Sequence, residues 1–167
     1  AGNGAFVNGI KNMCQNNLFY DIQPGNDQIA KQDYLNLPID NTIISDFHKI
    51  HIIGNPPFGK QSSLAIKFIK KSAKYCDTIS FILPKSFKKD SMQRHFPINF
   101  HLIFQTDLPQ DSFLVNNILH NVPCVFQIWV KRNSSREVPE KLVPNNNYSF
   151  VKKDENPDIS FRRVGVN

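Results

Sequence analysis

The chain has 167 residues, of which 40% are hydrophobic and 20% are charged, and its formal net charge at pH 7 is +6. This length corresponds to one domain, and the apolar fraction is sufficient for one ordinary core. No apolar run approaches the length needed to span a bilayer, so we expect no membrane partner. The positive charge gives mild support to a polyanionic partner such as nucleic acid.

The spacing of cysteine and histidine predicts no metal site. The five histidines are dispersed, and the three cysteines, Cys14, Cys76 and Cys124, lack the paired spacing of zinc ligands. We expect these thiols to be reduced and mostly buried, as in a cytoplasmic-type compartment, whether bacterial, viral or nucleocytoplasmic.

Apolar runs separated by Gly, Pro, Asn and Asp predict the elements of the first third of the chain. In chain order we expect a short helix over 5–16, a strand over 17–22 that ends at Asp21, a turn at 23–27 leading into a brief helix, a short strand or loop at 41–44, and a buried strand over 49–54.

The middle of the chain alternates helices and strands more regularly. We expect a helix capped by Ser62 or Ser63 and running to about Cys76, a strand Thr78–Leu83 stopped by Pro84, a helix Ser86–His95 stopped by Pro97, and strands Asn99–Thr106 and Pro123–Lys131. This alternation predicts an α/β domain over residues 1–132 with a mostly parallel sheet.

The composition changes after Arg132. Residues 133–147 are rich in Asn, Ser, Pro and Glu, which predicts a linker or mobile loop. Residues 148–167 regain strand character at Tyr148–Val151 and Ile159–Val164, as a C-terminal segment or the start of a further region.

One short motif stands out because of its stiffness. Asn55-Pro56-Pro57-Phe58 follows the apolar run that ends at Gly54. Two adjacent prolines fix φ, remove two backbone donors and bias the first proline towards extended geometry. The result is a stiff corner that holds an amide and an aromatic ring, a pair suited to methyl transfer onto a planar amino nitrogen.

Asn55–Phe58 resembles motif IV, (Asp/Asn/Ser)-Pro-Pro-(Tyr/Phe/Trp), of the amino-methyltransferases that use S-adenosylmethionine. The opening Ala1-Gly2-Asn3-Gly4-Ala5-Phe6 resembles the glycine loop of the same family, and Asp21 and Asp33 follow in the family's order. These landmarks span about a third of the chain. The stretch 82–87, Ile-Leu-Pro-Lys-Ser-Phe, resembles DNA adenine methyltransferases in which the cofactor loop precedes the catalytic loop.

The resemblance implies a fold and an activity. The fold is the Rossmann-like class I methyltransferase sheet, with strand order 3-2-1-4-5-7-6 and an antiparallel final strand. The activity is transfer of a methyl group from S-adenosylmethionine to the N6 amino group of adenine in DNA. Because that sheet has a central strand before the glycine loop, we expect a strand of mostly Val, Ile or Leu to precede Ala1 in a longer native polypeptide.

The resemblance also implies cofactor-binding residues. Asp21 would accept the ribose hydroxyls, by the logic of the acidic residue in dinucleotide folds. Asp33 would accept the adenine amino group, with Tyr34 or Leu35 packing on the ring. The full implied set is Ala1, Gly2, Asn3, Gly4, Phe6, Asp21, Asp33, Tyr34 and Asn55.

For catalysis, the resemblance implies that Asn55 and the carbonyl of Pro56 accept the two hydrogens of the target amino group, with Pro57 holding the corner. Acceptors placed for a tetrahedral nitrogen stabilise the transition state more than the planar ground state. Phe58 would stack on a base that has left the duplex. The further substrate-binding residues are Phe113, Lys85, Lys88 and Lys89.

Each of these residues also has an ordinary structural interpretation. The glycines fit a simple turn, Asp21 a capping or turn position, and Asp33 a surface loop. The corner fits a strand-to-helix turn with Phe58 in the core, and Phe113 fits a core position better than a base contact. The lysines at 67, 70, 71 and 74 recur on one helix face, which favours a solvated face over a phosphate-binding one.

Other functions stay open at the level of the sequence. RNA adenine or guanine amino-methyltransferases and protein-glutamine methyltransferases use the same catalytic loop, although glutamine-modifying relatives usually have tyrosine at the position of Phe58. A non-catalytic methyltransferase-like subunit is a different class of alternative. Target recognition would come from a separate domain or subunit.

Overall fold

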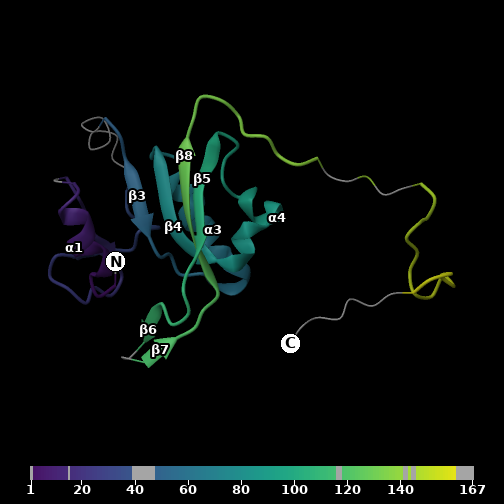
Figure 1. Ribbon diagram of the computed structural model, residues 1–167, viewed down its shortest axis with the longest axis horizontal. Helices are drawn as coiled ribbons and strands as arrows, with labels where there is room; N and C mark the ends of the chain where they lie inside the picture. Colours follow the sequence, from purple (N-terminus) through teal and green to yellow (C-terminus); the bar gives the residue numbers. More distant parts are fainter. Residues whose placement is uncertain are drawn as a thin grey trace.

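The computed structural model describes residues 2–14, 16–38, 48–115, 118–140, 143 and 146–160. At its centre is a four-stranded sheet in the order β3-β4-β8-β5 (Figure 1). Its strands are β3 (His51–Gly54), β4 (Thr78–Pro84), β5 (Phe100–Asp107) and β8 (Cys124–Lys131).

The sheet is mixed. β3 and β4 run parallel, whereas β8 is antiparallel to both of its neighbours, β4 and β5. The α/β class is therefore confirmed, and three of the four strands point the same way, with β8 antiparallel between β4 and β5. As a result β3, β4 and β5 all end at one edge of the sheet, which we call the carboxyl edge.

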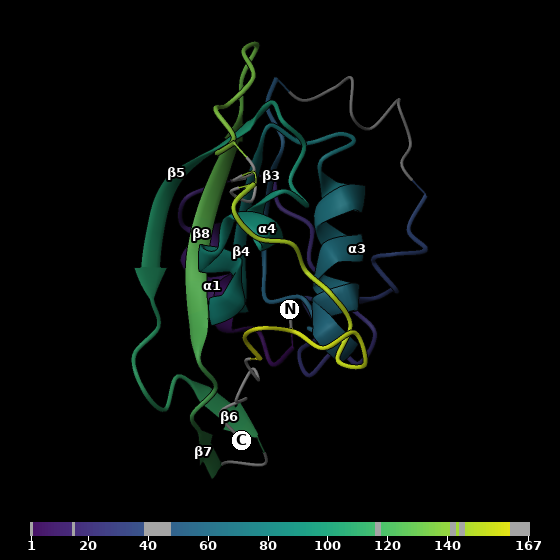
Figure 2. The same cartoon turned by 90° about the vertical axis from the view of Figure 1, so that its right-hand side faces the viewer.

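Alternation along β4 and β8 directs one set of side chains into the core. In β4 these are Ile79, Phe81 and Leu83, and β8 places Val125 and Trp129 on the same face. Three helical elements pack against this face: α3 (Ser63–Ser72), η2 (Lys85–Lys88) and α4 (Asp90–Gln93) (Figure 2). The apolar side chains buried here are Ala65 and Ile69 of α3 and Phe87 of η2. Phe96, in the turn that follows α4, is buried with them.

A fully buried amide lies within this apolar layer. Gln127 Nε2 donates to the Phe87 carbonyl at 3.1 Å and to Gln105 Oε1 at 2.7 Å. Gln127 Oε1 accepts the indole N–H of Trp129 at 3.0 Å. The amide thus satisfies the polar groups around it, as burial requires, and ties β8 to β5 and to η2.

The amino-terminal residues form a smaller unit beyond the β3 edge of the sheet (Figure 1). It contains α1 (Ala5–Lys11) and the parallel pair β1 (Tyr20–Asp21) and β2 (Ala30–Lys31). The predicted helix over 5–16 is thus shorter, since asparagines favour turns over helix interiors. The brief helix expected after residue 27 is instead β2, whose Ala30 N–H bonds the Phe19 carbonyl at 2.8 Å.

Two predicted helices are shorter than expected. α3 ends at Ser72 rather than near Cys76, because the chain tightens into bonds such as Tyr75 N–H to the Ser72 carbonyl. The helix predicted for 86–95 is divided into η2 and α4 by Lys89, whose backbone is extended at φ −84° and ψ 141°.

The strand at 49–54 is only partly buried. Ile53 is 43% exposed; among the described residues, β3 pairs with β4 alone and forms an edge of the sheet. The stretch 41–44 lies outside the described residues. An unpredicted hairpin, β6 (Phe113–Val115) with β7 (Ile118–His120), joins β5 to β8.

The stretch predicted as a linker, 133–147, begins with residues packed on the core. The Arg136 guanidinium lies 5.4 Å over the Trp129 ring. It also donates to four carbonyl oxygens, those of Gln93, Phe96, Pro97 and Phe100. Farther along, the described residues 146–160 include no strand, and residues 161–164 lie outside the described part.

Within the described ranges, no helix combines the length and apolar character needed to cross a bilayer. The thiols are free, with Cys76 and Cys124 buried and Cys14 exposed, as expected for mostly buried cysteines.

Replacing Gln127 by leucine should destabilise the fold. The Trp129 N–H and the Phe87 carbonyl would stay buried without a partner, at about 1–3 kcal/mol for each group. Urea unfolding followed through Trp129, the single tryptophan, measures the change in free energy. Gln105→Leu is the control, because Gln105 is exposed and accepts one of these bonds; equal losses in the two variants would contradict the assigned role of the Gln127 amide.

Candidate functional site

The Asn-Pro-Pro-Phe corner begins directly after β3, at the carboxyl edge. Asn55 is exposed, Pro56 is buried and Phe58 is half-buried. The Phe58 carbonyl accepts the N–H groups of Leu64 at 3.1 Å and Ala65 at 3.4 Å. These are first-turn donors of α3 that lack partners within the helix. The corner is therefore fixed to the helix start, and no side chain of the predicted caps Ser62 and Ser63 is needed there.

The backbone that follows the corner is strained. Gly59, Gln61 and Ser62 have φ values of 69°, 52° and 63°. For residues other than glycine this conformation costs about 1 kcal/mol or more each, and such strain clusters at functional sites. At residue 59 glycine is required, because an added Cβ would lie 2.8 Å from Leu64 Cγ.

The glycine loop and Asp21 form one hydrogen-bonded cluster. The Gly2 N–H donates to Asp21 Oδ2 at 2.7 Å, and the Gln23 N–H donates to Asp21 Oδ1 at 2.9 Å. The Gly2 carbonyl accepts the Gly25 N–H at 3.1 Å. Asn3 packs so closely on Gly25 that a Cβ there would lie 2.4 Å from Asn3 Oδ1. The sequence-predicted loop is thus brought to the end of β1.

These contacts stabilise the Asp21 carboxylate in its charged form. Partial burial raises the pKa of Asp21, but the hydrogen bonds to its carboxylate, including those from the Gly2 and Gln23 N–H groups, outweigh burial and hold that pKa below its usual range. Asp21 is therefore a charged acceptor at neutral pH.

Two other members of the predicted loop lie nearby. Gly4, with φ of 94°, begins α1 and is buried, whereas Phe6 is half-buried on the first turn of that helix. Ala1 lies outside the described residues.

Asp33 lies in a loop and accepts hydrogen bonds from other residues of that same loop. Its Oδ1 accepts the Leu35 N–H at 2.9 Å, and its Oδ2 accepts the Asn36 side-chain amide at 2.7 Å. This is the local pattern of an aspartate turn. The carboxylate therefore shapes the loop in which it lies.

Tyr34 is held against α3. Its ring stacks on Phe68 with centroids 5.0 Å apart. Its hydroxyl bonds Ser72 Oγ at 2.7 Å and also bonds the Tyr75 hydroxyl. Burial raises the pKa of both tyrosines, so both hydroxyls are neutral at physiological pH. The ring predicted to pack on adenine thus also fastens its loop to the helix.

The lysine face of α3 borders the same loop. Lys71 Nζ donates to the carbonyls of Leu35 and Leu37 and lies 5.5 Å over the Tyr34 ring. An open hollow of about 600 Å³ lies here, lined by Asp33, Leu35, Asn36, Leu37, Lys67, Lys70, Lys71 and Lys74. Sequence spacing identified the lysines, but not that one of them binds the loop.

The three predicted substrate lysines differ in their surroundings. Lys85 and Lys88 both pair with Asp107, at 3.0 and 2.9 Å. These two hydrogen bonds, with little opposition from burial, lower the pKa of Asp107. Lys89 is exposed at the start of α4. All three follow the end of β4 and therefore lie at the carboxyl edge. Phe113 begins the β6–β7 hairpin and is half-buried.

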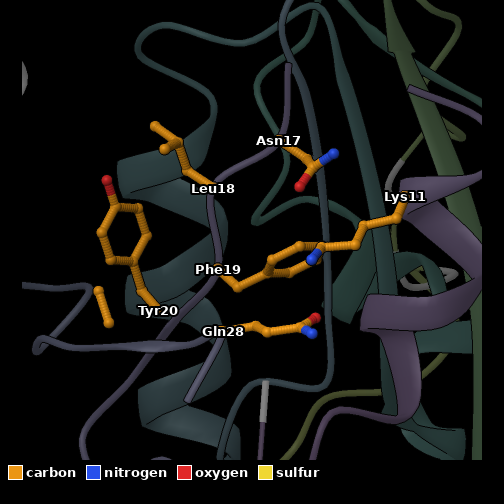
Figure 3. A pocket seen from close by; sticks show the side chains of 7 residues that line it. Lys11, Asn17, Leu18, Phe19, Tyr20 and Gln28 are labelled. Atoms are coloured by element: carbon orange, nitrogen blue, oxygen red, sulfur yellow. The ribbon is translucent and has the colours of Figure 1, made fainter. Parts of the chain in front are cut away.

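A second hollow, of about 370 Å³, was not predicted. It lies between the end of α1 and the β1–β2 pair, where Asn17, Phe19 and Gln28 extend towards Lys11 while Leu18 and Tyr20 point the other way (Figure 3). No motif marks these residues, because the hollow arises only when α1 folds back along β1.

No protein-family model, curated protein or solved structure matches this chain. The resemblance to the amino-methyltransferases therefore rests on the residues themselves and on their positions in the fold.

Removing the Asp21 carboxylate should release the glycine loop. In Asp21→Ala we expect the Gly2 and Gln23 amides to exchange hydrogen at least about tenfold faster, since each loses a charged acceptor. Amide exchange by NMR measures this. Asp27→Ala is the control, because Asp27 is an exposed carboxylate in the same turn, and unchanged exchange in Asp21→Ala would contradict the anchoring role.

The same contact predicts a pH dependence. Because the folded-state pKa of Asp21 is lowered, its contribution to stability is complete above the ordinary carboxyl range and is lost as pH falls through the lowered value. The Gly2 amide chemical shift, followed by NMR as the pH is lowered, should therefore titrate below the ordinary range of an aspartate carboxyl.

Proposed function

We propose that this chain is a class I methyltransferase domain that transfers a methyl group from S-adenosylmethionine to the N6 amino group of adenine in DNA. The observation that carries the proposal is the Asn55–Phe58 corner directly after β3, at the carboxyl edge. Open α/β sheets bind their ligands outside the carboxyl ends of their strands. The motif thus lies where a reaction centre is expected.

The order of the sheet supports the proposal. Among the four strands of β3-β4-β8-β5, β8 alone runs antiparallel to the others. In the proposed fold, these four strands would be strands 4-5-7-6 of the 3-2-1-4-5-7-6 order. The corner would then follow strand 4, as motif IV does in the resemblance.

The residues near the glycine loop fit the cofactor. Gly2 has open space before it, since an added Cβ would meet no other atom within 4 Å. Beside it, the charged Asp21 carboxylate is held by backbone donors. An ionised carboxylate is the kind of acceptor that the hydroxyls of a ribose diol require. S-adenosylmethionine supplies, when bound, an electrophilic methyl group on a sulfonium.

The corner fits the chemistry of an amino nitrogen. The lone pair of adenine N6 is delocalised into the ring, so the nitrogen is a poor nucleophile. Asn55 Oδ1 and the Pro56 carbonyl would accept its two hydrogens in a tetrahedral arrangement, which stabilises the transition state more than the ground state. Pro56, Pro57 and the Phe58 carbonyl bonds hold these acceptors still. The half-buried Phe58 ring would stack on the base.

The charge at this edge supports a nucleic acid over a protein substrate. Lys85, Lys88 and Lys89 follow β4, and Asp107 offsets only part of their positive charge. Phosphate contacts by such lysines position a strand without reading its sequence.

Loss of the Asn55 amide should lower methyl transfer and spare cofactor binding. Removing one preorganised polar partner of a transition state typically costs about 100- to 1000-fold in rate. Single-turnover methylation of adenine-containing DNA by Asn55→Ala, beside calorimetry of cofactor binding, measures both. Asn8→Ala is the control because Asn8 is exposed on α1. A folded Asn55→Ala variant that transfers methyl groups at the wild-type rate would exclude this mechanism.

Phe58 should act on base positioning. We expect Phe58→Ala to weaken both base engagement and turnover, since stacking on one base contributes about 1–3 kcal/mol, while Phe58→Trp retains part of both. Phe150→Ala removes an aromatic ring that is 72% exposed and serves as the control. Parallel assays with RNA and protein substrates test the choice of substrate; methyl incorporation confined to RNA or to protein would refute the DNA assignment.

Asp21→Ala should weaken S-adenosylmethionine binding by at least about 1–3 kcal/mol, the cost of removing a charged acceptor from a polar ligand. Calorimetry against Asp27→Ala measures this loss. Unchanged affinity in Asp21→Ala would show that the ribose is bound elsewhere.

A further inference from the structure

The β6–β7 hairpin presents an apolar surface at the carboxyl edge. Leu114, Ile118 and Leu119 are 69%, 65% and 58% exposed. Leu114 and Leu119 are direct partners in the antiparallel register, so their side chains share one face of the ribbon. An isolated two-stranded hairpin is marginally stable in water, and two exposed leucines add no stability unless a partner covers them.

The base of the hairpin is anchored at the carboxyl edge of the sheet, the same edge at which the Asn-Pro-Pro-Phe corner lies. The Leu108 N–H donates to the Cys124 carbonyl at 3.0 Å, and the Lys85 N–H donates to the Pro123 carbonyl at 3.0 Å. The hairpin therefore leaves the sheet between the ends of β5 and β4. Figures 1 and 2 both show it projecting past the carboxyl edge, away from the core.

Cations flank this base. Lys85 and Lys88 reach across to Asp107, the last residue of β5, and Lys89, the next residue in the chain, is exposed. The hairpin thus presents two exposed leucines on one face of its strands, and three lysines lie near its base. A DNA duplex whose phosphates bind these lysines would bring its base pairs against the leucines.

We propose that the β6–β7 hairpin is a wedge that enters duplex DNA beside the target adenine, with Leu114 and Leu119 inserted between base steps. This inference rests on the proposed function. A two-stranded ribbon fits a DNA groove, and apolar side chains that enter between bases unstack them and assist distortion of the duplex. An adenine must leave the stack before its amino group can reach Asn55. The wedge lowers the cost of that step in a duplex and is not needed for a single strand.

The test compares Leu114→Ser/Leu119→Ser with wild type on two probes. One is a mixed-sequence DNA duplex with 2-aminopurine at several adenine positions, and the other is the same strand alone. Fluorescence of 2-aminopurine reports unstacking, and anisotropy reports binding. We expect the variant to lose most of the fluorescence rise and to bind and methylate the duplex at least about tenfold less well, while it binds and methylates the single strand as wild type does.

Two controls make the result specific. Ile159→Ser removes an aliphatic side chain that is 81% exposed away from the hairpin and should behave as wild type. Leu114→Met/Leu119→Met keeps this face of the hairpin apolar and should retain the fluorescence rise. Serine and methionine variants that behave alike would overturn the wedge. Unchanged duplex unstacking in the serine variant would do so as well.

The outcomes separate the wedge from the proposed function. Wild-type protein that unstacks the duplex through the leucines but transfers no methyl group would sink the proposed function and leave the wedge standing. If wild-type protein methylates DNA and the serine variant methylates the duplex equally well, the wedge is excluded and the proposed function stands. Wild-type protein that binds neither probe would sink both.

Discussion

The antiparallel insertion of β8 between β4 and β5 is the constraint on which the rest of the structure depends. β8 pairs along its length with both neighbours, from Cys124 opposite Pro84 to Lys131 opposite Phe100. It also carries Trp129, which stacks on Phe96 at 4.0 Å. Since β8 must begin where β5 ends, the connection between them emerges at the carboxyl edge. The hairpin, the lysines after β4 and the corner after β3 are therefore gathered on one side.

The corner is a second constraint, and it is local. Two prolines fix the backbone, and the Phe58 carbonyl ties that backbone to the first N–H groups of α3. The left-handed residues that follow are destabilising in themselves, yet α3 packs Ala65 and Ile69 into the core and holds them in place. The burial of Ala65 and Ile69 thus offsets the backbone strain that precedes α3. The corner is held rigid as a result, and Asn55 is exposed on it.

The positively charged side chains fall into two groups: some bind backbone carbonyls and stabilise the fold, and others stay exposed to solvent. Lys71 fastens the 33–37 loop by binding two carbonyls, and the Arg136 guanidinium donates to four more beside the start of β5. The remaining lysines of α3 stay at the solvated face that their spacing predicts. Net positive charge alone therefore does not identify a nucleic-acid surface. Within the described part of the chain, cations lie next to both a candidate reaction centre and exposed leucines at the carboxyl edge.

The sequence by itself determined what depends on neighbouring residues. Apolar runs ended by proline predict β4, and alternation predicts β5 and most of β8, because strand formation and termination are set by short-range sterics. The proline pair marks the corner for the same reason, since each ring restricts only its own backbone and that of the residue before it. Asp21 likewise lies at a strand end as predicted, although that strand is much shorter than expected.

Only the tertiary structure decided what depends on residues far apart in the chain. β8 lies between β4 and β5 because Trp129 and Gln127 find partners there, and no local pattern encodes a choice of strand neighbour. Tyr34 and Arg136 have the sequence surroundings of loop residues, and their roles arise from the packing of α3 and the Trp129 ring against them. The meaning of a polar or aromatic side chain is set by the group that it reaches, and that group is fixed only when distant segments pack.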